Sequence, residues 1–264
     1  MGRFAYFLVM IILFLSGVVG VLLNLDNLFE DLGRFAQPQL SCAATSLSLS
    51  ELQAQANAIT VKVFAEDISG SGILLQKKEN SYLVITNDHV IAYSSSDELN
   101  IKTVDGVLHR VKLSAITRLE NKDLAWFTFD SELDYQVSDF WKQTPVQENQ
   151  TVFVAGFPIE ANRQKSRGFL LTQGKIVMII PKQLTGGYQL GYSNDVQKGM
   201  SGGPVLNCQG QLVGVNGLHK HPIWDYRYIF EDGTIASNNE QTKMRSLSWG
   251  ISGQLLKQLI PHLI

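Results

Sequence analysis

The feature of the sequence that most restricts its fold is a long series of short apolar runs that begins near residue 59. The runs are rich in valine, isoleucine, phenylalanine and tyrosine, which fit the pleated surface of a sheet. Clusters of glycine, asparagine, aspartate or lysine separate them about every 8 to 12 residues, a spacing typical of all-β proteins. The pattern predicts an all-β fold with enough strand for two small barrels. The predicted strands are ITVKVFAE, SGILLQ, SYLVITN, LNIKTV, LHRVKLSAI, LAWFTFD, TVFVAGF, GFLLTQGKIVMII, YQLGYS, GPVLN and QLVGVNGL.

Three segments depart from this strand pattern. Residues 131–149 lose the alternation and are predicted to join the two halves. Ser48 and Glu51 stand at the spacing of a capping box, which predicts a short helix before the strands. Apolar residues at helical spacing over 255–259 predict a C-terminal helix on the second half. The resulting division is an N-terminal segment over 1–23, a linker with a short helix over 24–57 and a main domain over 58–264.

Residues 4–23 form an uncharged, apolar run of 20 residues at the start of the chain. At about 1.5 Å per residue, a helix of that length spans roughly 30 Å, the hydrocarbon thickness of a bilayer. Arg3 precedes the run and Asp26, Glu30 and Asp31 follow it, so the positive-inside rule places the N-terminus in the cytoplasm. The run predicts a transmembrane anchor with everything after it outside the cytoplasm. The alternative is a cleaved signal peptide, which would release a secreted protein.

The overall charge is close to balance, with 22 lysines and arginines against 24 aspartates and glutamates. Proteins that bind nucleic acid carry a basic surplus, so we expect no nucleic-acid partner. Two cysteines, Cys42 and Cys208, are compatible with one disulfide in an oxidising compartment. Their separation in sequence gives no geometric support for pairing, and both are interpreted as structural residues.

His89 is the histidine, among five in the chain, whose surroundings favour a chemical role. It follows the apolar run YLVIT and the polar residues Asn87 and Asp88, a pattern that holds an imidazole at a surface on a fixed backbone. A lone histidine in such a place is also compatible with a structural role. An imidazole that acts as a base needs an acid to orient it, and Asp123, directly before the run LAWFTF, is the best candidate. The alternative for Asp123 is a simple turn residue.

The hexapeptide GMSGGP, residues 199–204, places Ser201 among three glycines. Such clusters are common in surface turns, so the motif alone is a weak signal. A serine hydroxyl becomes a nucleophile when a neighbouring base takes its proton, and the oxyanion formed needs backbone N–H donors. Glycine at 199 lets a peptide N–H turn toward that oxyanion without a Cβ in the way. The candidate donors are the backbone N–H groups of Gly199 and Ser201.

The order His89, Asp123, Ser201, in the contexts TNDHVI, KDLAWF and GMSGGPVLN, resembles the chymotrypsin-type serine peptidases. The likeness is to the disulfide-poor bacterial branch with HtrA-like and glutamyl-endopeptidase-like members, and the stretches GSGILL, VFVAGFP and GQLVGVNG agree with it. It covers residues 58–262. The resemblance implies two six-stranded antiparallel barrels with the active site between them. It also implies peptide-bond hydrolysis through an acyl-enzyme on Ser201, with His89 as general base and Asp123 as its orienter.

The sequence departs from the family pattern at three points. Met200 stands where animal digestive relatives carry the acid that captures a new N-terminus, so activation of that kind is not expected. The disulfide set of those relatives is absent too. HtrA-like proteins usually carry a C-terminal PDZ domain, and the residues after Ser201 are too few for the end of a barrel and another domain. We therefore expect no peptide-sensing module.

The substrate pocket is the least determined part of the expected site. Asp195 lies six positions before the motif serine, where trypsin-like enzymes hold the carboxylate that pairs with lysine or arginine substrates. Lys198 is close enough in sequence to neutralise it. Gly217 and His219 belong to the segment expected to form the pocket wall. Four bulky residues of this segment either line the pocket or cover the second barrel: His219, His221, Trp224 and Tyr228.

We predict a membrane-anchored serine endopeptidase that acts on protein or peptide substrates and needs no cofactor and no metal ion. Two alternatives of other classes stay open. One is a catalytically inactive trypsin-like domain that binds peptides or partner proteins, and the other is a non-catalytic membrane protein with a β-rich exterior domain. The presence of all three residue types of the triad favours the enzyme. Geometry must decide among them, because a triad is recognised by the distances between its side chains.

Overall fold

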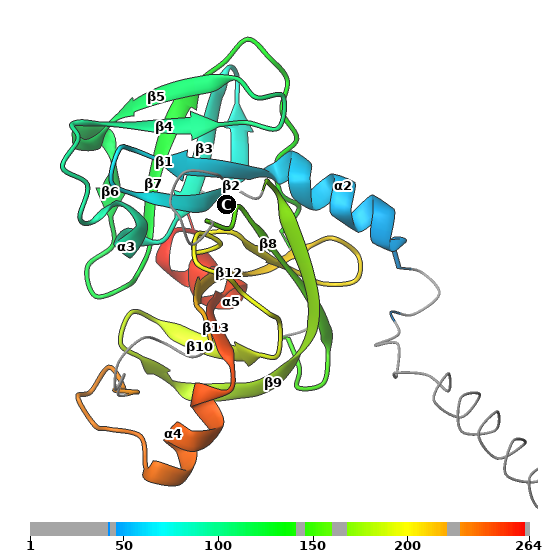
Figure 1. The fold of residues 1–264 in the computed structure, drawn as a ribbon, viewed down its shortest axis with the longest axis vertical. Coiled ribbons are helices and arrows are strands. Elements are labelled where there is room, and N and C mark those ends of the chain that lie inside the picture. The colour runs from blue at the N-terminus through cyan, green and yellow to red at the C-terminus, as the bar shows by residue number, and fades with distance from the viewer. Residues whose placement is uncertain (1–41, 43–45, 141–145, 160–167, 221–227, 262–264) are drawn as a thin grey trace, which may run out of the picture. The chain divides into compact units, whose positions relative to one another are not determined.

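The first strands of the main domain form one antiparallel sheet, in the upper half of the view in Figure 1. The computed structural model describes residues 42, 46–140, 146–159, 168–220 and 228–261, all within the unit that begins at Cys42. Seven strands make up the sheet in the order β5-β4-β1-β2-β3-β7-β6. Their bounds are β1 Thr60–Phe64, β2 Ser69–Lys78, β3 Ser81–Thr86, β4 Glu98–Lys102, β5 Leu108–Lys112, β6 Thr117–Arg118 and β7 Ala125–Asp130.

The later strands close into a barrel, in the lower half of the same view (Figure 1). The hydrogen-bonded order around the barrel is β10-β13-β12-β11-β8-β9, and β9 pairs with β10 to complete the ring. The bounds are β8 Thr151–Gly156, β9 Leu170–Leu184, β10 Tyr188–Tyr192, β11 Pro204–Leu206, β12 Leu212–Leu218 and β13 Ser248–Ser252. In sequence, the predicted joint over 131–149 falls between the last strand of the sheet and the first strand of the barrel.

The expectation of two six-stranded barrels is correct for the second half and wrong for the first. The sheet of the first half is curled, so that β5, at one end, approaches β7, the strand next to the other end. The two-residue strand β6 lies along the start of β7, at Ala125 and Trp126. Because β6 occupies that edge, hydrogen bonding in the described part of the chain leaves the sheet open. The first half is therefore a curled sheet, and the second half is a closed barrel.

Short helices flank the strands, and two of them were predicted. Helix α2 (Leu49–Ile59) begins at Ser48, whose side chain accepts the Glu51 N–H while Glu51 accepts the Ser48 N–H, which confirms the capping box. Helix α5 (Gly253–Leu259) confirms the predicted C-terminal helix. Sequence reasoning missed helix α4 (Asn238–Arg245), although Ser237 and Glu240 form a second capping box before it. Two further helical turns in the described residues are α3 (Asp88–Ile91) and the 3-10 helix Leu113–Ala115.

The predicted membrane anchor, residues 4–23, lies outside the described residues. Within the part of the chain that the structure describes, no helix is both long and apolar enough to cross a bilayer. The anchor therefore stays a prediction from the sequence.

A continuous apolar core joins the sheet to the barrel. Ile73 and Ile85 come from β2 and β3, and they belong to the same buried cluster as Phe153 of β8 and Leu206 of β11. All four side chains are at most 3% exposed. Burial of apolar surface of this kind stabilises contact between the two halves. It also sets the position of the loops that emerge where the halves meet.

Cys42 and Cys208 form a disulfide, which decides the question that the sequence left open. Their Cα atoms are 5.6 Å apart, although 166 positions separate them in the sequence. The cross-link ties the segment before α2 to the turn that follows β11. A bridge across so long a loop restricts the unfolded chain, which contributes a few kcal/mol of stability.

Candidate active site

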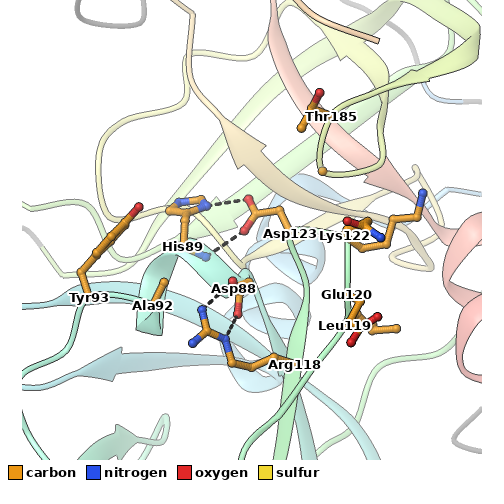
Figure 2. A pocket seen from close by; sticks show the side chains of 12 residues that line it. Asp88, His89, Ala92, Tyr93, Arg118, Leu119, Glu120, Lys122, Asp123 and Thr185 are labelled. Carbon is orange, nitrogen blue, oxygen red and sulfur yellow. Dashed lines mark hydrogen bonds and ion pairs between the residues drawn. The ribbon is translucent and has the colours of Figure 1, made fainter. Parts of the chain in front are cut away.

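His89 and Asp123 are brought together by the pairing of β3 with β7. The register joins Thr86 to Ala125 at the ends of these strands, so the residues just beyond them lie side by side. His89 is the second residue of α3, and its Nδ1 lies 2.6 Å from Asp123 Oδ2. The backbone N–H of His89 also donates to Asp123 Oδ1 at 2.8 Å (Figure 2). Both carboxylate oxygens therefore contact the same histidine.

The neighbours of this pair hold it in place. Asn87 Nδ2 donates to the backbone oxygen of Asp123 at 2.8 Å. Asp88, although adjacent to His89 in sequence, turns away and binds the guanidinium of Arg118 (Figure 2). Arg118 Nε donates to Asp88 Oδ1, and Arg118 Nη2 donates to Asp88 Oδ2 at 2.8 Å. Asp88 is thus engaged elsewhere, and Asp123 is the acid beside the imidazole.

The Asp123 carboxyl is largely buried, with 14% of its side chain exposed. Burial opposes its ionisation, and hydrogen bonds from His89 and Tyr188, with the charge of a protonated His89, act in the other direction. The outcome is a pKa for Asp123 below the ordinary aspartate value. Asp123 is therefore a carboxylate near neutral pH, and it can only accept hydrogen bonds there.

The loop that carries Ser201 is fastened to the sheet through one residue of β2. The Ser71 N–H donates to Ser201 O at 2.8 Å, and Ser71 Oγ donates to Gly199 O at 2.9 Å. Ser71 Oγ also accepts the Phe157 N–H at 2.9 Å, which connects the same residue to the segment after β8. These bonds cross between the two halves and place the motif GMSGGP beside the sheet.

The structure brings Ser201 close to the histidine segment without a direct bond between them. The next residue, Gly202, is packed so tightly that a Cβ there would lie 3.1 Å from the Asn87 backbone nitrogen, two positions before His89. The Ser201 hydroxyl itself donates to Gly217 O at 2.8 Å. Among the described residues, no hydrogen bond joins Ser201 Oγ to the imidazole. The serine side chain is thus turned toward β12.

The backbone N–H groups of Gly199 and Ser201 were predicted to be the oxyanion donors. In the described part of the chain, neither the Gly199 N–H nor the Ser201 N–H donates to a protein group, whereas the Met200 N–H between them donates to Gln197 O at 3.1 Å. Gly199 has φ of +95°, a conformation that other residues rarely adopt. Two peptide N–H groups on either side of Met200 are therefore available to an incoming oxygen.

A hollow of about 470 Å³ lies beside the imidazole. Its walls come from α3 and the two residues that follow it, from the end of β6 and the segment between β6 and β7, and from the turn between β9 and β10 (Figure 2). Tyr93 stands at its side with 84% of its surface exposed. Its lining includes His89 and Asp123 but not Ser201.

The family model described as "Trypsin-like peptidase domain" matches residues 70–215. The chain belongs to this family. The match contains His89, Asp123 and Ser201, and it confirms the resemblance noted in the sequence.

Curated relatives of the trypsin-like domain are serine proteases. The chain is 26% identical over 204 residues to "Serine protease Do-like HtrA" of Bacillus subtilis (strain 168), which covers 72% of this chain and 43% of the relative. It is 28% identical over 148 residues to "Probable periplasmic serine endoprotease DegP-like" of Rickettsia conorii, covering 56% of this chain and 28% of the relative. The chain thus spans less than half the length of these relatives.

A solved structure shares the fold of the domain. The serine endoprotease from Yersinia pestis superposes with a TM-score of 0.60 at 20% sequence identity, over 83% of this chain and 67% of that one. Identity at that level supports the shared fold alone.

Of the predicted pocket residues of the trypsin-like domain, Gly217 contacts Ser201, whereas Asp195 and His219 contact Lys220. Asp195 has 67% of its side chain exposed and forms an ion pair with Lys220, Nζ to Oδ1 2.9 Å, rather than with Lys198. Gly217 provides the carbonyl that accepts the serine hydroxyl. His219 Nδ1 lies 2.8 Å from Lys220 O. A basic substrate side chain would have to compete with Lys220 for Asp195, so Asp195 as the specificity acid stays a prediction.

The bulky residues after the pocket segment are only partly described. His221 and Trp224 lie outside the described residues. Tyr228 is 1% exposed, packs against Trp249 with ring centroids 6.0 Å apart, and donates its hydroxyl to Met244 O. Tyr228 therefore covers the barrel instead of lining a pocket.

Sequence reasoning missed two residues that contact the trypsin-like site. Ser71 lies in the stretch GSGILL, which supported the resemblance without indicating that its hydroxyl fastens the serine loop. Tyr188, at the start of β10, donates its hydroxyl to Asp123 Oδ2. A tyrosine in a strand run predicts an ordinary core residue, so no local signal pointed to that contact.

Proposed function

We propose that this domain is a serine endopeptidase that hydrolyses peptide bonds through an acyl-enzyme on Ser201. The observation that supports it most is the double hydrogen bond from His89 to Asp123, at the place where the Ser201 loop meets the sheet. Membership of the trypsin-like peptidase family and the serine protease relatives support the same reaction. The substrates of this class are proteins or peptides.

His89 is the general base in this proposal. Because the Asp123 carboxylate can only accept, the proton on the imidazole resides on Nδ1 and the lone pair on Nε2. The Ser201 side chain rotates from Gly217 O to Nε2 between staggered positions when substrate binds. As Oγ bonds to the scissile carbonyl carbon, its proton passes to Nε2, and His89 then gives that proton to the leaving amine.

The tetrahedral intermediate carries its negative charge on the former carbonyl oxygen. The N–H groups of Gly199 and Ser201 are the donors that we assign to it, and their lack of other protein acceptors supports this role. Collapse of the intermediate breaks the peptide C–N bond and leaves the acyl group on Ser201. A water molecule, activated by the same imidazole, then releases the acid.

One observation favours the second candidate, a trypsin-like domain that binds peptides without cleaving them. The Ser201 hydroxyl donates to Gly217 O and not to His89. In that state the imidazole has no serine proton to accept. Catalytic hydrogen bonds often form only when substrate binds, so the enzyme is the better supported proposal.

A fluorophosphonate probe separates the two candidates. The full-length chain in detergent should become covalently labelled, because the probe reacts with an activated serine. The Ser201→Ala variant should remain unlabelled, and a substitution of an exposed serine away from the site, Ser114→Ala, should label like the parent. If the parent and Ser201→Ala both stay unlabelled, the peptide-binding alternative is favoured and the enzyme proposal fails.

We also place the domain outside the cytoplasm, held there by residues 4–23 as a membrane anchor. The Cys42–Cys208 disulfide supports this, since such bridges persist in oxidising compartments. The Rickettsia relative is described as periplasmic, in agreement. In intact cells, both thiols should resist alkylation until a reductant is added, whereas Cys42→Ser should leave Cys208 reactive. Alkylation of both thiols in untreated cells would contradict an exterior location.

A further inference from the structure

Asp123 is held from both halves of the domain. From the sheet, His89 contacts both of its carboxylate oxygens. From the barrel, Gly186 O accepts the Asp123 N–H at 2.9 Å, and the Tyr188 hydroxyl donates to Oδ2. Gly186 lies in the turn between β9 and β10, and Tyr188 is the first residue of β10. The carboxylate thus lies between an imidazole and a phenol that come from different halves.

Tyr188 reaches Asp123 through a space that only a glycine leaves open. Its side chain is 2% exposed, and its ring lies against Gly217 of β12. A Cβ at Gly217 would lie 2.7 Å from Tyr188 Cζ and closer still to the neighbouring ring carbon and the hydroxyl. Any other residue at 217 would displace the ring. Gly217 is also the residue whose carbonyl accepts the Ser201 hydroxyl, so the ring packs beneath the peptide that holds the serine.

We propose that Tyr188 is a positioning residue for the triad, which holds the Asp123 carboxylate in orientation and withdraws part of its charge. This inference rests on the proposed function of the site. The Tyr188 hydroxyl and His89 Nδ1 share one acceptor, Oδ2, so the phenol directly affects the charge that the imidazole meets. A buried tyrosine needs a partner for its hydroxyl, but a backbone carbonyl would meet that need equally well.

Two effects follow from the shared oxygen. First, the carboxylate cannot rotate about its Cβ–Cγ bond without losing bonds to residues of both halves, so the alignment of His89 depends on how the sheet and barrel meet. Second, a hydroxyl donor lowers the negative charge on Oδ2 and thereby weakens the attraction between Asp123 and a protonated imidazole. Removal of the hydroxyl should let the imidazole keep its proton to a higher pH.

The test is the rate of fluorophosphonate labelling as a function of pH, measured on the full-length chain in detergent. Tyr188→Phe keeps the ring and removes the donor. We expect labelling at neutral pH to slow about tenfold, the effect of losing one hydrogen bond to a charged group. The acidic limb of the profile, the pH range in which labelling slows as the pH falls, should move to higher pH. An acidic limb that stays at the parent's pH, or moves below it, would overturn the proposal, because loss of packing alone does not change that limb.

Tyr82→Phe is the matched control. Tyr82 is also fully buried, and its hydroxyl donates to the backbone carbonyl of Leu133, after β7, at 2.9 Å. A carboxylate oxygen of Asp134 lies further from that hydroxyl, at 3.4 Å, and this carboxylate does not contact His89. It should lose stability like any buried tyrosine without moving the acidic limb. Tyr188→3-fluorotyrosine provides a second variant with the ring intact and a more acidic hydroxyl. Because it is a stronger donor, the limb should move to lower pH, and a shift in the other direction would count against the proposal.

A readout without catalysis separates this inference from the proposed function. In the Ser201→Ala background, the nitrogen resonances of His89 report its titration by NMR. Adding Tyr188→Phe should raise the titration midpoint, and an unchanged midpoint would overturn the inference. Absence of labelling in the parent would refute the proposed function, whereas parent labelling with an unmoved His89 titration would refute only the role of Tyr188.

Discussion

Replacing His89 by alanine should lower the rate of hydrolysis of an unstructured protein substrate, such as labelled casein, by about 10⁶-fold. The reason is that the Ser201 proton would have no acceptor at the site, and the Asp123 carboxylate would face an empty space. Substrate binding should change little, since the imidazole acts on the serine and the leaving group. The measurement is the cleavage rate at a fixed enzyme concentration, with circular dichroism to verify folding.

His109→Ala is the matched control for this prediction. His109 is also a partly buried histidine, but it lies in the sheet, with Nε2 3.2 Å from the Tyr135 hydroxyl and its ring 4.3 Å from that of Phe129. Its loss should reduce stability and leave the rate per folded molecule close to the parent's. A His89→Ala protein that still cleaves within tenfold of the parent would remove the general base from the mechanism.

Replacing Asp123 by asparagine should reduce the same rate by about 10⁴-fold, with the fold retained. Three donors converge on the Asp123 carboxylate: the backbone N–H of His89, its Nδ1–H and the Tyr188 hydroxyl. An amide has one oxygen, so its NH₂ group must face at least one of these donors. Opposite Nδ1, that group favours the tautomer with the proton on Nε2, which cannot accept the serine proton.

Asp134→Asn is the control for the second substitution, because Asp134 is exposed and pairs with Lys77 in the sheet. Its rate should match that of the parent. Asp123→Asn should also change acid unfolding. The pKa of Asp123 is depressed in the folded chain, so its contribution to stability is present above the unfolded aspartate value and is lost as the pH falls through the folded value. If the variant hydrolysed substrate as fast as the parent, Asp123 would have no role in orienting the base.

The strand pattern of the sequence indicated most of the architecture because buried strands leave local signals. The predicted runs from ITVKVFAE to QLVGVNGL each correspond to a strand, and two helices were indicated by their caps or their spacing. Strand β13 was missed because serine and glycine interrupt the strand-favouring tryptophan and isoleucine of its sequence, SWGIS. The two-residue strand β6 was missed as well, because it is too short to show a pattern. The sequence also did not indicate that the first sheet stays open instead of closing into a barrel. Closure depends on whether the two edge strands form hydrogen bonds with each other after folding.

The residue types of the site were also readable in sequence order. His89 and Asp123 stand next to apolar runs that fix their backbones, and Ser201 stands in a glycine-rich turn. The contacts from more distant segments were not readable. Ser71 fastens the serine loop, and Tyr188 contacts Asp123, yet both occur in strand runs that predict ordinary core or edge residues.

By itself, the sequence determined the all-β class, the helix caps and the three residue types on which the proposed chemistry depends. These follow from local periodicity and from side-chain chemistry, which need no knowledge of distant contacts. Only the tertiary structure decided that one half is an open sheet, that Cys42 pairs with Cys208, that Asp195 forms an ion pair with Lys220 and that the serine hydroxyl faces Gly217. Each of these depends on the packing of segments far apart in the chain, because the distances and orientations between such segments are set when the core forms.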